Sequence, residues 1–127
     1  MSRGAIGVAG ALGFTAVAVG AFGAHGLRDR LDAYSISVYE RAVFYHFVHA
    51  LAMLIVPLLA QAGLLSNAAA SRVCWLLLAG IVLFSGSLYV LAVTGVRSLG
   101  MITPLGGVAF IAAWVVLAVS ALASSNS

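Results

Sequence analysis

Three histidines are the residues of this chain best suited to chemistry, since imidazole can bind a metal, hydrogen-bond a quinone or carry a proton. His25 ends the first apolar stretch, and His46 and His49 are spaced so that both lie on one face of a helix. In an antiparallel bundle, Tyr89 and Thr103 lie at the same end of the molecule as these histidines. The sequence therefore predicts a candidate ligand-binding or hydrogen-bond cluster of His25, His49 and Tyr89, with Thr103 nearby.

Three interpretations of this cluster stay open. The favoured one is structural: imidazoles hydrogen-bond across helices and satisfy polar groups that hydrocarbon cannot. A metal or haem site would need two or more nitrogens converging on one ion at about 2.0–2.1 Å. A quinone, lipid or proton site is the third interpretation. The chain has no cysteine pair, acidic dyad, phosphate-binding glycine loop or serine elbow, so no catalytic residue or metal ligand is assigned and the cofactor stays unknown.

The histidines lie within four long stretches of sequence that carry no charged side chain, and these stretches are the elements that position them. Each can supply the roughly 20 apolar residues that cross the ~30 Å hydrocarbon layer of a bilayer as a helix. With 64% hydrophobic and 7% charged residues, the chain could not cover a water-exposed surface. The sequence predicts an all-α integral membrane four-helix bundle, one domain over residues 1–127, with helices at about 4–25, 38–61, 74–94 and 103–122.

Residues 27–36 form the only long polar stretch, between the first two predicted helices. Its apolar residues recur at helical spacing, which predicts a short interfacial amphipathic helix lying in the headgroup plane. Ser37 and Glu40 then fit the capping-box pattern, which places the start of the next helix near Val38.

The first helix holds half of the fourteen glycines in the chain. Ala16, Gly20 and Ala24 recur every four residues on one face, with Gly23 beside them, and Gly86 is a further small residue in the third span. Strips without side-chain bulk let helix backbones approach closely in lipid. We therefore expect these five residues to pack against helices and the first helix to be the most enclosed. Its partner is either another helix of the same chain, which is favoured, or another subunit.

Several runs along the chain form one recognisable set: GAFGAHG at 20–26, Tyr45 with His49, LFSGSLY at 83–89, and TPLGG at 103–107 followed by Phe110 and Trp114. Together they resemble the domain of unknown function 423 family of transmembrane protein 256-like small membrane proteins. The resemblance implies a small multi-helix membrane protein without an established activity. It also makes His46 the weakest of the three candidates, because His25 and His49 fall in the family's motifs and His46 does not.

The favoured function is that of a non-enzymatic multi-pass membrane protein, a structural or accessory component that self-associates or packs in a larger membrane complex. The alternative is a membrane protein that uses the His/Tyr cluster to bind haem, quinone, lipid or metal. A small transporter ranks third, because the spans lack charges. The expected partners are the lipid bilayer and other membrane subunits, and not nucleic acid, since the six arginines do not cluster. The expected location is the bacterial plasma membrane.

Overall fold

The computed structural model describes residues 2–124, and every regular element within that range is helical. In chain order the elements are α1 (Ser2–Phe22), the π-helical turn η1 (Gly23–Leu27), α2 (Ala33–Gln61), α3 (Asn67–Gly80), the π-helical turn η2 (Ile81–Ser85), α4 (Gly86–Thr94), the 3-10 turn η3 (Arg97–Met101) and α5 (Thr103–Ser124). They give four segments long and apolar enough to cross a membrane. The predicted all-α, four-span membrane architecture is confirmed.

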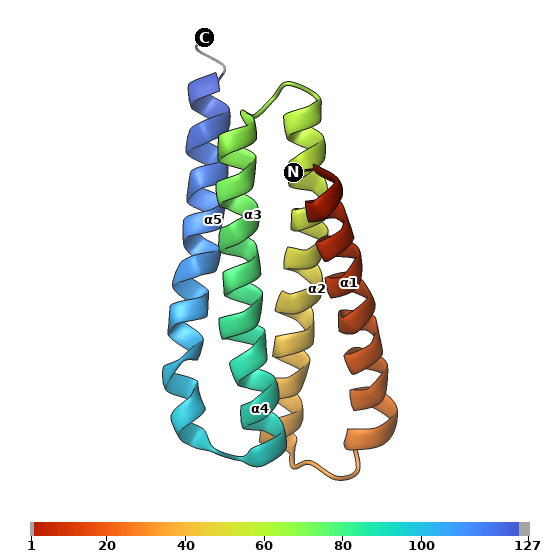
Figure 1. Cartoon of the computed structure of the whole chain (residues 1–127). Helices are drawn as coiled ribbons and strands as arrows, with labels where there is room; N and C mark the ends of the chain where they lie inside the picture. The colour runs from red at the N-terminus through yellow and green to blue at the C-terminus, as the bar shows by residue number, and fades with distance from the viewer. Residues whose placement is uncertain (1, 125–127) are drawn as a thin grey trace.

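The four spans alternate in direction, so the α1–α2 turn and η3 lie at one end of the molecule and the α2–α3 turn at the other (Figure 1). α2 packs against α1, α3, η2 and α4, and α5 packs against α3 and η2. α1 and α5 lie on opposite sides of the molecule, with α2 and α3 between them (Figure 1). α2 is therefore the central element, and a side chain on it can reach every other span.

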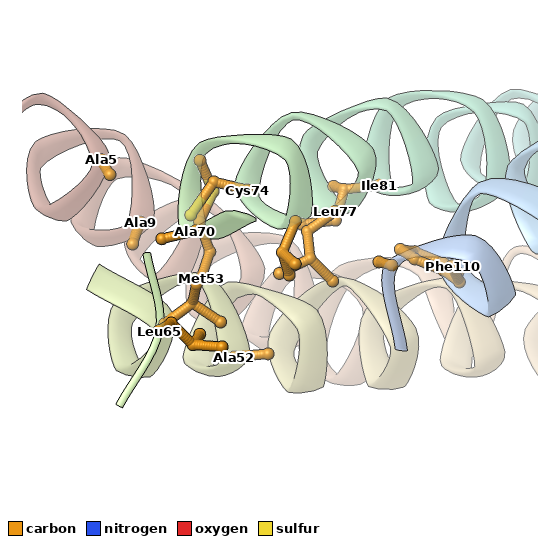
Figure 2. Close-up of a cluster of buried hydrophobic side chains, with 13 residues drawn as sticks. Ala5, Ala9, Ala52, Met53, Leu65, Ala70, Cys74, Leu77, Ile81 and Phe110 are labelled. Atoms are coloured by element: carbon orange, nitrogen blue, oxygen red, sulfur yellow. The ribbon is translucent and has the colours of Figure 1, made fainter. Parts of the chain in front are cut away.

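Two apolar clusters fill the bundle. Figure 2 shows the first, in which small and large side chains of α1, α2, α3 and α5 meet, among them Ala9, Met53, Cys74, Leu77 and Phe110. The second lies toward the α1–α2 turn and includes Val38, Tyr39, Ala42, Leu88 and Leu91. In lipid the burial of such residues stabilises mainly through van der Waals contact, since lipid tails are as apolar as leucine.

Glycine allows the third and fourth spans to approach closely. A Cβ added to Gly106 of α5 would lie 2.7 Å from Cα of Phe84 in η2. A Cβ added to Gly80 of α3 would overlap the ring of Phe110 in α5. A methyl group at either position would force the helices apart, so this contact requires both glycines.

The N-cap of α2 is Asp32, and the predicted start near Val38 is wrong. Asp32 Oδ1 accepts a hydrogen bond from the Ser35 backbone amide at 2.7 Å, and α2 begins at Ala33. This bond holds the pKa of the Asp32 carboxyl below its usual value of 3.8. Ser37 does not cap a helix; its hydroxyl donates to the Tyr34 carbonyl at 2.7 Å. Because Asp32 already satisfies an amide of the first turn, the predicted capping box is not needed.

The separate amphipathic helix predicted over residues 27–36 is not found. Residues 28–32 form a turn, and residues 33–36 are the first turn of α2. The apolar spacing that suggested an independent helix comes from the end of η1 joined to the start of α2.

α3 also begins earlier than predicted, at Asn67 rather than near residue 74. Ser66 Oγ accepts from the Ala69 amide at 3.1 Å and caps the helix. Arg72 is exposed within this first part of α3. A charged side chain near the end of a span can remain helical while its head lies among the lipid headgroups.

The expectation that the first helix is the most enclosed is wrong. In the most apolar window of each span, 17% of residues are buried for the first span, against 39% and 44% for the second and third. The cause is its position at one side of the bundle, where α2 is its main packing partner (Figure 1). Much of the surface of α1 is therefore left to lipid or to another protein.

Candidate functional site in the bundle interior

His46 joins three helices. It is 5% exposed on α2, and its Nδ1 lies 2.8 Å from the Tyr89 hydroxyl of α4. Its Nε2 lies 3.2 Å from Oγ1 of Thr15 in α1, whose hydroxyl donates to the Leu12 carbonyl at 3.0 Å. Since the Thr15 proton is used in that bond, Thr15 accepts from Nε2–H of His46, and Nδ1 accepts from Tyr89. We therefore assign His46 as the neutral Nε2–H tautomer.

His49, one turn further along α2, has the opposite tautomer. Its Nδ1 lies 2.7 Å from the Tyr45 carbonyl, which can only accept, so Nδ1 carries the proton. Its Nε2 accepts from the Trp114 indole N–H of α5 at 3.1 Å. The imidazole also stacks on Phe110, with ring centroids 3.7 Å apart. His49 therefore joins α2 to α5.

Both imidazoles have every ring nitrogen hydrogen-bonded within the protein. A metal ion or haem iron at either ring would have to displace one of these partners. Among residues 2–124, no three His, Cys, Asp or Glu side chains are placed to hold a metal ion. The hydrogen-bonded chain from Tyr89 through His46 and Thr15 ends on a backbone carbonyl, so it is better suited to tying helices together than to passing protons.

Hydroxyl groups of the third span add a second polar layer. Ser85, which is 0% exposed, donates to the Ala42 carbonyl of α2 at 2.8 Å. Ser87 Oγ lies 2.7 Å from Oγ1 of Thr103 in α5. Within residues 2–124, no buried side-chain nitrogen or oxygen lacks a hydrogen-bond partner. The polar groups of the interior are thus satisfied by other helices, as hydrocarbon surroundings require.

The π turn η2 positions this layer. Gly86 N–H bonds to the Ile81 carbonyl, five residues back, so the turn contains more residues than an α-helical turn would. The helix continues without a break into α4, which carries Tyr89 toward His46. π turns occur often at functional sites, where they change which residues face a neighbouring helix.

The structure divides the predicted cluster. Tyr89 bonds to His46 and not to His49, and His25 lies exposed in η1. His46, the weakest candidate from the sequence, makes the contact expected of His49. Ser87, rather than a histidine, is the hydrogen-bond partner of Thr103.

Thr15 and Trp114 complete the site, although neither is among the predicted site residues. The spacing of the buried face of α2 could have identified His46, because Ala42, His46, His49 and Met53 recur at intervals of three and four, and all are buried. The partners on α1 and α5 carry no comparable signal, since they depend on how each helix is rotated.

The residues predicted to pack between helices differ in their surroundings. Ala16 is 1% exposed, and Gly20 and Gly23 approach side chains of α2. Ala24 is exposed, and a Cβ added to Gly86 would find open space within 4 Å. The close contact of the first span with α2 therefore involves Gly20 of α1 and Gly23 of η1, and Ala16 is buried one turn before Gly20.

Four apolar spans, with charges at their ends and an interior joined by hydrogen bonds, define a small polytopic helical membrane protein. The family described as "Protein of unknown function (DUF423)" matches residues 19–107. The chain belongs to this family, and the resemblance inferred from the sequence is confirmed.

Similar proteins are named UPF0382 membrane proteins. The chain is 49% identical over 107 residues to YwdK of Bacillus subtilis (strain 168), and the alignment covers 84% of this chain and 86% of that relative. It is 49% identical over 110 residues to a relative from Staphylococcus epidermidis (84% and 85% covered) and 44% identical over 108 residues to one from Staphylococcus aureus (83% and 84%). No solved structure matches the chain. The bacterial membrane-protein relatives and the four apolar spans fit a location in the bacterial plasma membrane.

Proposed function

We propose that the protein is a non-enzymatic membrane component that acts by associating with a second copy of itself through α1. The observation that carries this proposal is a hollow of about 410 Å³ between α1 and α2. It is lined only by apolar residues and glycines, including Gly10, Gly13 and Phe14 of α1 and Phe47 and Leu51 of α2.

The hollow and a protruding side chain lie on the same face of α1. A Cβ added to Gly10 or Gly13 would meet nothing within 4 Å, and Phe14 beside them is 73% exposed. In a two-fold symmetric pair the same surface of both copies meets, so Phe14 of each copy can enter the hollow of the other. Close packing of this kind, with small residues against a large one, favours association of helices in lipid.

The histidines do not support the alternative function of binding haem, quinone, lipid or metal equally well. Every ring nitrogen of His46 and His49 is already hydrogen-bonded within the protein, and the third candidate, His25, lies exposed in η1. A structural role for His46 and His49 fits the proposal, because the bonds to His46 tie α1 and α4 to α2.

The test replaces Gly10 with leucine. Because nothing of the chain itself lies within 4 Å of an added Cβ, Gly10 has room for a side chain, and Gly10→Leu places one at the hollow. We expect a dimer of the natural chain in mild detergent, observed by native mass spectrometry, and a monomer of Gly10→Leu. Gly4→Leu is the matched control: it is an open glycine of α1 that lines a different hollow, against α3.

A natural chain that is monomeric at every protein-to-detergent ratio would overturn self-association. So would equal dimer fractions in Gly10→Leu and the natural chain. A complex with an unrelated subunit, lost in Gly10→Leu and kept in Gly4→Leu, would replace the second copy with a different partner.

A further inference from the structure

A second hollow lies between the end of the first span and the first turns of α2. Its volume is about 130 Å³. Gly20 and Gly23 line it from the first span, and Val43 and Tyr39 line it from α2. Arg28 also borders it, and the hollow thus combines apolar walls with charge.

The charged groups at this hollow are a base and an acid. Arg28 Nη2 lies 3.5 Å from Glu40 Oε1, and the two side chains are 68% and 62% exposed. An exposed ion pair of this kind contributes little to stability, so ligand charges can replace it. A guanidinium binds phosphate through two parallel N–H groups, and a carboxylate accepts hydrogen bonds from an ammonium. The pair therefore suits a ligand that carries both a phosphate and an ammonium.

The depth of the hollow is that of lipid headgroups. α2 has 29 residues and is about 43 Å long, which exceeds the ~30 Å hydrocarbon layer. Residues 42–61 carry no charge and rise about 30 Å, so they match that layer. Glu40 then lies just outside the hydrocarbon, and Arg28 follows the end of the first span at Leu27.

We infer that this hollow is a binding site for a zwitterionic phospholipid with a primary ammonium, phosphatidylethanolamine. Arg28 binds the phosphate, and Glu40 accepts from the ammonium. The start of an acyl chain lies along Gly20 and Val43. Phosphatidylglycerol offers the phosphate without the ammonium, and Glu40 repels its negative charge. This inference goes beyond self-association and involves a different end of the α1–α2 contact.

The same headgroup chemistry occurs in free phosphoethanolamine, but the site favours the lipid. Gly20, Val43 and Ile36 give apolar walls that a small soluble zwitterion would leave uncovered. The hollow also lies between two spans, where lipid is the surrounding solvent.

The experiment is native mass spectrometry of the full chain in mild detergent with added dioleoylphosphatidylethanolamine or dioleoylphosphatidylglycerol. We expect the natural chain to retain phosphatidylethanolamine about 1.4- to fivefold better, the range for exchange of one exposed ion pair. Glu40→Gln removes the ammonium partner and the repulsion, so the preference reverses toward phosphatidylglycerol. Arg28→Gln loses retention of both lipids. Two matched controls at the same membrane side, Arg41→Gln and Asp29→Asn, lie outside the hollow and keep the natural preference.

Equal retention of the two lipids by the natural chain would overturn the inference. An unchanged preference in Glu40→Gln, or unchanged retention in Arg28→Gln, would also overturn it. If free phosphoethanolamine displaces the lipid at equal concentration, the apolar walls do not contribute and the site is not a lipid site. None of these outcomes depends on whether the chain dimerises, because each is read from lipid adducts of whichever species is present.

Discussion

The bond between Tyr89 and His46 can be tested by a double-mutant cycle. Tyr89→Phe removes the hydroxyl that donates to Nδ1 at 2.8 Å and leaves a buried acceptor without a partner. His46→Leu removes the imidazole and leaves the Tyr89 hydroxyl without its acceptor. The double variant removes both groups, so neither is left unpaired.

The expected magnitudes follow from the number of bonds lost. Hydrogen bonds between membrane helices average about 0.6 kcal/mol and reach about 1.7 kcal/mol. Tyr89→Phe loses one such bond and should destabilise by about 1 kcal/mol, including the cost of the unpaired Nδ1. His46→Leu loses two, to Tyr89 and Thr15, and should destabilise by about 1–2 kcal/mol. The double variant should be less destabilised than the sum of the single variants by about 0.6–1.7 kcal/mol.

Cys74 supplies the assay. It is the only cysteine of the chain and is 4% exposed, at the edge of the hollow that Gly4 also lines, so a maleimide reacts with it much faster when the bundle opens. When opening and closing are fast, the labelling rate follows the population of the open state, and about 1 kcal/mol of destabilisation raises it about fivefold. Thr94→Val is the control, because Thr94 donates to the Val90 carbonyl of its own helix.

Additive effects in the cycle, to within about 0.3 kcal/mol, would refute the interhelical bond. So would a Tyr89→Phe variant that labels no faster than Thr94→Val.

Two further predictions concern the helix contacts and the cap of α2. Gly106→Ala should lower the thermal unfolding midpoint, at a cost of about 1–3 kcal/mol, because its Cβ would lie 2.7 Å from Phe84 Cα. Gly86→Ala is the control and should be neutral or stabilising, since its Cβ would meet nothing within 4 Å. Equal midpoints in the two variants would contradict the close contact at Gly106. The depressed pKa of Asp32 means that its cap stabilises the fold above the usual value of 3.8, and that this contribution is lost as pH falls through the lower folded pKa. Thermal unfolding followed by circular dichroism between pH 7 and pH 2 should therefore show an acid loss of stability that is smaller in Asp32→Asn, and identical profiles would contradict the role of the ionised carboxylate.

The four spans could be predicted because they depend on one strong physical constraint, the exclusion of charge from hydrocarbon. The helix starts could not, because Asp32 and Ser37 are both good caps, and only the geometry of the turn decides between them. The interior contacts were harder still. His46 and His49 are one turn apart, and their partners depend on the rotation of α1, α4 and α5 about their own axes, which apolar sequences with little amphipathicity do not specify.

The π turn at Ile81–Ser85 sets which residues of the third span face the neighbouring helices. This register depends on the number of residues in the turn more than on which side chains they carry. An insertion or deletion of one residue there turns everything that follows by about 100° around the helix axis. Deleting a single residue from this stretch would restore α-helical pitch and leave a continuous helix, yet it would carry Tyr89 away from His46 and present a neighbouring side chain instead. The length of this turn is therefore fixed by the hydrogen bonds that follow it. The register of the helix, and not the chemistry of the deleted residue, decides whether the interior hydrogen bonds can form.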